Sequence, residues 1–579
     1  MVAGISLTER LNRHPAQKVA MLLLIVVGSL MFASEVFAQG DTNDIHLELN
    51  VKDGYENTAI WVGLAILLGV YGLIITEAVH RTLAAAIGGV VAVLALNYFT
   101  VESALTLAAV TTMIDWETIG LLLGMMVMVG ILSKTGIFEW FAVEAYKKSK
   151  GSIWTLVVIL CSVTAVLSAF LDNVTTMLLI TPVTIQLAKV LDLKPIPILI
   201  SEVIFSNVGG AATMIGDPPN IMIGSGLSPT AIAGRGYEDL ASSGVTFNDF
   251  ITEMAPGILM TIVPTFMLVK YLYRDEFSGE RHRDIAELEA KYGVKDAKLL
   301  KTSGFILGLV ILGFFLHPIL HIAVSWVALA GAVLMLLATN RHEIEESLEK
   351  VEWTTLLFFA GLFVLVHSLQ YLGVINFIGE YVEKGIKFFP EGEGGFIRLS
   401  AAILIILWVS AFASAFIDNI PYTATMIPIV LQISHSLSIE LGPLIWALAF
   451  GACLGGNGTL IGASANVVTA GMAEEAGYPI SFKEFFRAGF PVMILTTAIV
   501  SVYMIAVYVF SADHTLYAKI VLLGITLVGI ILQVSRGISK GKSFSESLID
   551  DEYDEIKEVV SGTIDNVKST LMSKISEEE

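Results

Sequence analysis

The sequence contains few charged residues and very few cysteines, and each scarcity excludes a class of protein. Only 15% of its 579 residues are charged, whereas 55% are hydrophobic, and a soluble protein does not tolerate that balance. Its two cysteines lie far apart in apolar stretches, so neither a disulfide framework nor a cysteine metal cage is expected. Lysine and arginine number 34 against 54 acidic residues, and the formal charge of −20 argues against nucleic-acid binding.

Motifs for chemistry on a bound substrate are also missing. No glycine-rich loop of the nucleotide-binding type is present, so ATP-driven pumping is not expected. The histidines form no cluster with the spacing of metal ligands. No nucleophile stands in a recognisable pattern with a general base. We therefore expect a protein that is not an enzyme and that holds no resident cofactor or metal.

Long apolar runs are abundant, and their lengths match the thickness of a bilayer. Continuous spans are predicted at 58–79, 82–98, 117–134, 256–273, 303–318, 322–339, 353–370, 488–510 and 515–534. Four further apolar stretches are broken in the middle by polar residues, glycine or proline, at 153–188, 195–224, 397–437 and 442–472. The sequence predicts an all-α, multi-pass protein, which we expect in the cell (inner) membrane.

The two ends and the central loop differ from the spans. Residues 1–38 have the basic start, apolar core and small-residue site of a signal peptide, with an uncleaved first span as the alternative. Residues 39–57 form a short extracytoplasmic segment in this interpretation, 274–301 a charged cytoplasmic loop and 541–579 an acidic cytoplasmic tail. Basic residues at the span ends fall on one side, which is then cytoplasmic: Lys147, Lys148, Lys150, Arg274, Lys350, Lys483 and Arg487.

Two parts of the chain, 58–273 and 302–510, repeat the same pattern. SAFLDN (168–173) matches SAFIDN (414–419), and GGAATMIGDPPN (209–220) matches GGNGTLIGASAN (455–466), so equivalent positions are 246 apart in both motifs. The distribution of basic residues starts the first part outside and the second inside, which predicts inverted repeats. Inverted repeats with broken helices are typical of secondary transporters, whose substrate site lies near the membrane midplane.

An Asp-Asn pair interrupts one apolar stretch in each repeat, at 172–173 and at 418–419. A carboxylate within a membrane is expensive and faces the protein interior or a water-filled cavity. The neighbouring asparagine offers a carbonyl ligand and amide donors. We expect each aspartate to cap a helix and to bind a cation at the break between two short helices; a cap alone is the simpler alternative.

Glycine and proline break the second stretch of the first repeat around 209–219. Backbone groups freed there must be satisfied by protein, water or an ion; carbonyl oxygens suit Na⁺, whereas helix N-termini suit anions. A glycine kink that serves packing alone is the alternative. Asp217 adds a third carboxylate, and because its repeat partner is Ala463 the site is not symmetric. Glu202 is a candidate proton carrier, or else it pairs with a lysine at the membrane edge.

These motifs resemble the ion transporter superfamily that includes arsenite permeases, NhaD-type sodium/proton antiporters, CitMHS-like permeases and the P protein. SAFIDNIPYTATMIPIV (414–430) and the stretch 451–491 are most similar to the P protein branch. The resemblance implies two re-entrant hairpins and two broken helices in a transport domain that moves against a scaffold as an elevator, often in a homodimer. The signal-like start and the last span depart from the family's minimal pattern and leave the topology of both ends open.

The resemblance also implies a pair of mirrored binding sites. One cation-type site comprises Asp172, Asn173, Gly209, Gly210 and Asn220, and its mirror comprises Asp418, Asn419, Asn457, Thr459 and Asn466. The further candidate ion- or substrate-binding residues are Thr176, Asn207, Thr213, Asp217 and Thr423.

The two hairpin aspartates bear on the identity of the transported ion. The more distantly similar sodium-coupled dicarboxylate carriers have a neutral serine at that position. Because like charges repel strongly in low dielectric, Asp172 and Asp418 disfavour a dianion unless cations neutralise them first. A carboxylate binds Na⁺ or H⁺ in competition, which favours Na⁺/H⁺ antiport, with a small ion and membrane lipid as the expected partners. Efflux of arsenite or a related metalloid, carriage of organic or inorganic anions, and a channel stay open as alternatives.

Overall fold

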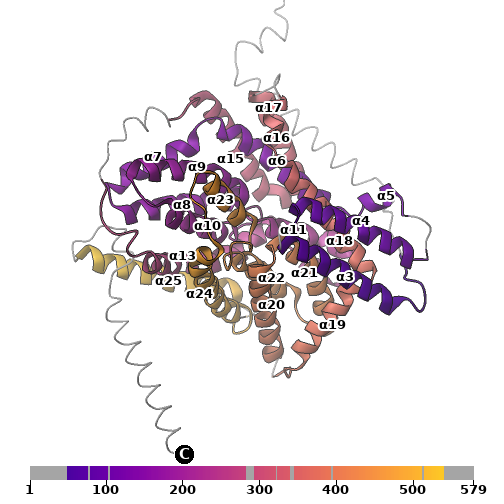
Figure 1. Ribbon diagram of the computed structural model, residues 1–579. Coiled ribbons are helices and arrows are strands. Elements are labelled where there is room, and N and C mark those ends of the chain that lie inside the picture. The colour runs from indigo at the N-terminus through magenta and orange to yellow at the C-terminus, as the bar shows by residue number, and fades with distance from the viewer. Residues whose placement is uncertain are drawn as a thin grey trace, which may run out of the picture.

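The chain folds into a bundle of helices (Figure 1). The structure is a computed structural model that describes residues 49–75, 78–101, 105–281, 293–320, 322–339, 344–392, 395–511 and 514–539. Within these ranges, ten helices are long and apolar enough to cross a membrane, and extended structure is limited to two isolated bridges. The predicted all-α membrane architecture is confirmed. The predicted signal peptide, residues 39–48 of the segment that follows it and the acidic tail lie outside the described residues.

The first half of the chain contains the helices α3 (Glu56–Ile75), α4 (Arg81–Phe99), α5 (Leu107–Thr111), α6 (Trp116–Ser133), α7 (Ile137–Ser149), α8 (Ile153–Phe170), α9 (Asn173–Leu191), α10 (Pro195–Gly210), α11 (Pro218–Gly226), α12 (Pro229–Gly234), the 3₁₀ helix η1 (Glu238–Ser243) and α13 (Phe247–Leu272). The breaks between α8 and α9 and between α10 and α11 coincide with the polar and glycine-proline interruptions of the sequence.

The second half contains α15 (Ala297–Leu320), α16 (Val324–Thr339), α17 (Ile344–Leu348), α18 (Trp353–Tyr371), α19 (Val374–Lys387), α20 (Phe396–Phe416), α21 (Asn419–Leu437), α22 (Leu441–Gly455), α23 (Ser464–Glu475) and α24 (Phe482–Tyr508), followed by α25 (Thr515–Ser539). The last helix has no counterpart in the first half. An ion pair between the buried Lys519 Nζ and the half-buried Glu253 Oε2, 2.5 Å apart, joins it to α13.

Several helices begin earlier than the apolar runs predicted. The clearest case is α13, which starts at Phe247 and not near residue 256, because Thr246 and Asp249 form a capping box ahead of the apolar part. Pro256 and Pro264 then lie inside the helix and do not end it. Two amphipathic helices, α7 and α19, were not predicted, since their apolar residues are interrupted by charged ones and form no long run.

Equivalent helices of the two halves make reciprocal pairs, in which α4, α6, α9 and α11 correspond to α16, α18, α21 and α23. Helix α4 packs on α18 as α16 packs on α6, and α9 packs on α23 as α21 packs on α11. Reciprocal contacts of this kind are what a two-fold relation between two similar units produces. Within each half the breaks are brought together by tight pairs, α8 with α10 and α20 with α22. The helix breaks of both halves therefore meet in the interior of the bundle.

Glycine permits the tight pair in each half. A Cβ atom on Gly209 of α10 would lie 2.2 Å from the Ala165 carbonyl oxygen of α8. A Cβ atom on Gly455 of α22 would lie 2.5 Å from the Ala411 carbonyl oxygen of α20. Any side chain at either position would force the two backbones apart. These glycines therefore set the distance between each hairpin (α8–α9 or α20–α21) and its broken helix (α10–α11 or α22–α23).

Candidate functional site

Both hairpin aspartates cap the helix that follows them. Asp172 Oδ1 accepts a hydrogen bond from the Thr175 amide at 2.8 Å, and its Oδ2 accepts one from Thr175 Oγ1 at 2.5 Å. Asp418 Oδ1 accepts from the Ile420 amide at 3.1 Å. Capping therefore explains why a helix starts directly after each aspartate. The two residues are only 6% and 7% exposed, so each negative charge stands at the edge of the interior.

The breaks between α10 and α11 and between α22 and α23 share one local structure. Asn220 Nδ2 donates to the carbonyl oxygens of Thr213 at 2.9 Å and Ala211 at 3.3 Å. Asn466, 246 positions later, donates in the same way to Thr459 at 2.9 Å and Gly456 at 2.8 Å. These side chains satisfy backbone carbonyls that a continuous helix would have used, as a membrane interior demands.

Threonine and glycine fix each break against its hairpin. The Thr213 hydroxyl donates to the Ala169 carbonyl near the end of α8, and the Thr459 hydroxyl donates to the Ala415 carbonyl near the end of α20. Gly210 allows close approach within its own break, because a Cβ there would lie 2.4 Å from the Gly216 carbonyl oxygen. The repeated sequence thus produces the same backbone twice.

Asp217 connects the two hairpins in the interior. Its Oδ1 accepts hydrogen bonds from Asn173 Nδ2 at 3.2 Å and from Asn419 Nδ2 at 3.3 Å, one from the first residue of α9 and one from the first residue of α21. Asp217 is fully buried, and none of the ion pairs among the described residues involves it. A carboxylate held by neutral groups keeps its capacity to bind a proton or a cation.

Asparagine side chains extend this contact across the boundary between the halves. Asn207 Oδ1 accepts from Asn173 at 3.0 Å, and its Nδ2 donates to Asn457 at 3.0 Å and to Asn466 at 2.9 Å. The repeat partner of Asn207 is Cys453, whose thiol lies 3.2 Å from Asn220 Oδ1. The contact of Asn207 with Asn466 is therefore matched by the contact of Cys453 with Asn220.

Two buried oxygen atoms near the start of α9 have no hydrogen-bond donor among the described residues. They are Asn173 Oδ1 and Thr176 Oγ1, and both side chains are almost fully buried. Buried polar atoms in proteins are nearly always satisfied, so each exception asks for an explanation. Amide and hydroxyl oxygens beside a carboxylate are ligands that a hard cation prefers.

The side chains of two predicted residues contact neither Asp217 nor a side chain of the asparagine cluster, which comprises Asn173, Asn207, Asn419, Asn457 and Asn466. The Thr423 hydroxyl donates to the Asn419 carbonyl of its own helix at 2.7 Å. Glu202 is fully buried, accepts from Thr184 Oγ1 at 2.8 Å, and its other oxygen has no partner in the described part of the chain. No ion pair of Glu202 with a lysine is found there, which leaves the proton-carrier interpretation for the proposal below.

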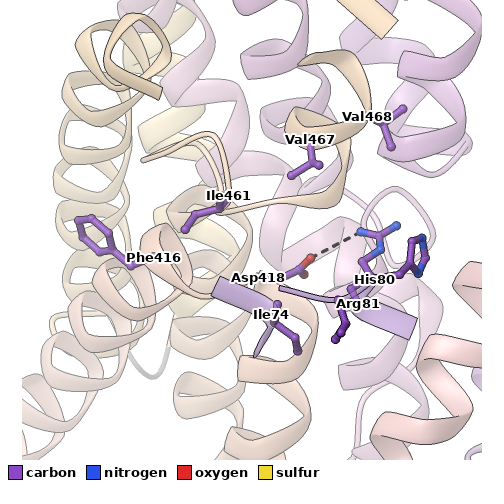
Figure 2. A pocket seen from close by; sticks show the side chains of 9 residues that line it. Ile74, His80, Arg81, Phe416, Asp418, Ile461, Val467 and Val468 are labelled. Atoms are coloured by element: carbon purple, nitrogen blue, oxygen red, sulfur yellow. Dashed lines mark ion pairs between the residues drawn. The ribbon is translucent and has the colours of Figure 1, made fainter. Parts of the chain in front are cut away.

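The sequence did not predict two residues that contact Asp418. Ser464 Oγ donates to Asp418 Oδ2 at 2.9 Å, and Arg81 Nη1 lies 3.7 Å from the same oxygen. Figure 2 shows the guanidinium directed at the carboxylate across the edge of a cavity of about 390 Å³. The sequence did mark Arg81 as unusual, because it is the only charged residue of the apolar helix α4. The two hairpins thus differ, since the ion pairs of the described residues include none with Asp172.

Residues 71–451 of the chain match the citrate transporter family, CitMHS. A protein of Mycobacterium tuberculosis described as an uncharacterized transporter is 39% identical over 446 residues, which cover 76% of this chain and 97% of the relative. The chain belongs to this citrate transporter family. The resemblance noted in the sequence is thereby confirmed, and the protein is an integral, multi-pass membrane transporter.

The chain is also similar to a longer protein and to a solved structure. The human P protein is 43% identical over 526 residues, which cover 79% of this chain but 61% of the P protein. The chain therefore matches less than two thirds of the length of that relative. A solved structure, the YdaH transporter of Alcanivorax borkumensis, aligns with a TM-score of 0.49 and 13% identity, over 75% of this chain and 97% of the transporter.

Proposed function

We propose that this transporter exchanges Na⁺ for H⁺. The observation that carries the proposal is Asp217, a fully buried carboxylate that contacts an asparagine of each hairpin and forms no ion pair among the described residues. Such a carboxylate must be neutralised, by a proton or by a cation, to be stable in a medium of low dielectric. Because a proton and a cation cannot occupy Asp217 together, binding of one releases the other. This competition is the basis of antiport.

The neighbouring oxygens support Na⁺ as the cation. We assign Asn173 Oδ1 and Thr176 Oγ1 as further ligands, since both are buried acceptors without a donor in the described residues. Asp172 and Asp418 add negative charge at the two hairpin tips. In this proposal, Glu202 carries a proton between α9 and α10, in a place where the second repeat has Leu448.

Alternating access is the second part of the proposal. The reciprocal pairing of helices supports inverted repeats, with α8 to α11 and α20 to α23 moving as one unit. The remaining helices would form the scaffold of an elevator, in a homodimer. Two equivalent hairpins would then give one gate for each side of the membrane.

A carrier of organic anions is the second candidate. Two observations favour it: the family is described as citrate transporters, and Arg81 contacts the site beside Asp418. Against it, the buried carboxylates would repel a dianion at short range. We therefore favour a cation over an organic anion as the transported ion.

Flux across a membrane tests the proposal directly. The purified protein is reconstituted in liposomes that trap a pH-sensitive dye, and Na⁺, Li⁺, K⁺, citrate or arsenite is added to an imposed proton gradient. We expect a pH change with Na⁺ or Li⁺, lost in Asp217→Asn and Asp172→Asn but kept in Glu391→Gln, which alters an exposed ion pair with Arg398. A response to citrate or arsenite alone would overturn the proposal.

A further inference from the structure

The tip of the α20–α21 hairpin is held by a cluster of three polar side chains from different elements. Arg81 begins α4, Asp418 caps α21 and Ser464 begins α23. The Arg81 guanidinium donates to Ser464 Oγ and lies 3.7 Å from Asp418 Oδ2, which also accepts from Ser464 at 2.9 Å. Two of the three, Arg81 and Asp418, line the cavity in Figure 2 together with His80, Ile461 and Val467.

Further contacts tie the same hairpin to α3 and tie Arg81 to α18. The Tyr71 hydroxyl of α3 lies 3.1 Å from the Pro421 carbonyl and 3.0 Å from Thr425 Oγ1, both in the first part of α21. The guanidinium of Arg81 also lies 5.6 Å from the ring centre of Phe358 in α18. Arg81 is thus positioned from the α4–α18 side, and it reaches toward the hairpin.

The arrangement has a consequence for any cation that approaches Asp418. A carboxylate already paired with a guanidinium is neutralised, and a second cation gains little there while the pair persists. Conversely, a cation or a proton on Asp418 removes the attraction between that carboxylate and Arg81, and with it one of the links between α4 and the hairpin. Arg81 also interacts electrostatically with Glu352, directly before α18, which keeps the guanidinium on the α4–α18 side.

We propose that Arg81 is a tethered cation that latches the α20–α21 hairpin to α4 until a transported cation or a proton replaces it on Asp418. Arg81 is then a positioning residue and not a ligand of the transported ion. The displacement step rests on the proposed cation exchange, whereas the latch itself does not. The first hairpin has no such latch among the described residues, so the two gates would open by different events.

The test uses a cysteine in the cavity beside the latch. Val467→Cys is introduced into the full chain, and its rate of modification by a membrane-impermeant maleimide is measured in Na⁺-free choline buffer. The native residues Cys161 and Cys453 are fully buried and give a low background. Thr230, in the first half of the chain, lines a second cavity of similar size, and Thr230→Cys is the control reporter.

We expect Arg81→Gln to raise the Val467→Cys rate by about fivefold or more, the usual range of coupling between two states. The Thr230→Cys rate should stay unchanged. Asp418→Asn should give a similar rise, and the double variant should add nothing, since both changes remove one interaction. Arg81→Lys keeps the charge and should keep most of the slow rate. An unchanged rate in Arg81→Gln, or an equal rise at both reporters, would overturn the latch.

Replacing choline by Na⁺ separates the latch from the proposed exchange. In the otherwise unchanged chain, Na⁺ should raise the Val467→Cys rate toward that of Arg81→Gln, and in Arg81→Gln it should have no effect. If Arg81→Gln labels fast while Na⁺ changes nothing in the unchanged chain, the latch is supported and its displacement by Na⁺ is overturned.

Discussion

The two hairpins of this transporter have nearly the same backbone but different electrostatic surroundings. Asp172 and Asp418 cap equivalent helices, and each break is fixed by an equivalent threonine and asparagine. Yet Asp418 has Ser464 and Arg81 beside it, whereas the Asp172 side chain accepts its hydrogen bonds from Thr175 of the helix that it caps. The residues that the two motifs share determine the backbone, whereas residues that differ between the halves determine the charge that each hairpin meets.

A second difference lies at the centre of the site. The first half supplies Asp217 and Asn207, where the second half has Ala463 and Cys453. The buried charge of the asparagine cluster therefore comes from one repeat, although asparagines of both repeats hold it. Two gates of similar shape would thus control a site whose charge is not shared equally.

Removing the central charge should have the largest effect. In Asp217→Asn, the hydrogen bonds from Asn173 and Asn419 lose their ionised acceptor, which costs about 3 kcal/mol or more and corresponds to more than about 100-fold in exchange rate. Proteoliposome pH traces measure this, with Asp275→Asn, an exposed residue beyond α13, as the matched control. Exchange near the unchanged rate in Asp217→Asn would refute a central role for this carboxylate.

Asp172→Asn and Asp418→Asn distinguish a cap from a binding site. Asparagine caps helices about as well as aspartate, so a purely structural role predicts normal exchange and normal thermal stability. We expect both variants to fold and to lose about tenfold or more in exchange rate, as outer ligands of an ion site do. Their melting temperatures in detergent check the fold. Normal exchange in both variants would show that the two aspartates act only as helix caps.

Much of this architecture could be predicted from the sequence, because its signals are local. Asp172 and Asp418 mark helix starts within apolar stretches, and the repeat fixed the equivalence of Asn220 with Asn466. The contacts that distinguish the halves are not local. Asp217 meets Asn419 across 202 positions, and Arg81 meets Asp418 from a helix outside the repeated motifs. No periodicity or spacing reports such contacts, since they depend on how α4 and α11 pack.

Alanine at the glycines of the two tight helix pairs should destabilise both halves to a similar extent. Gly209→Ala and Gly455→Ala each place a Cβ within 2.5 Å of a carbonyl oxygen, and overpacking of this kind costs about 1–3 kcal/mol. Both should lower the melting temperature in detergent. Gly308→Ala in α15, where a Cβ meets nothing within 4 Å, is the control and should be neutral or slightly stabilising. A loss in only one half would break the structural equivalence.

The smallest effect is expected where the halves differ most mildly, at Cys453 and its repeat partner Asn207. Cys453→Ala removes one weak thiol hydrogen bond to Asn220 and should cost less than about 1 kcal/mol of stability. Asn207→Ala removes contacts with three asparagines and should cost more. Thermal melts of both variants compare them within one protein. If Cys453→Ala proved the more damaging, the second half would hold the site together, and the division of roles between the repeats would have to be reversed.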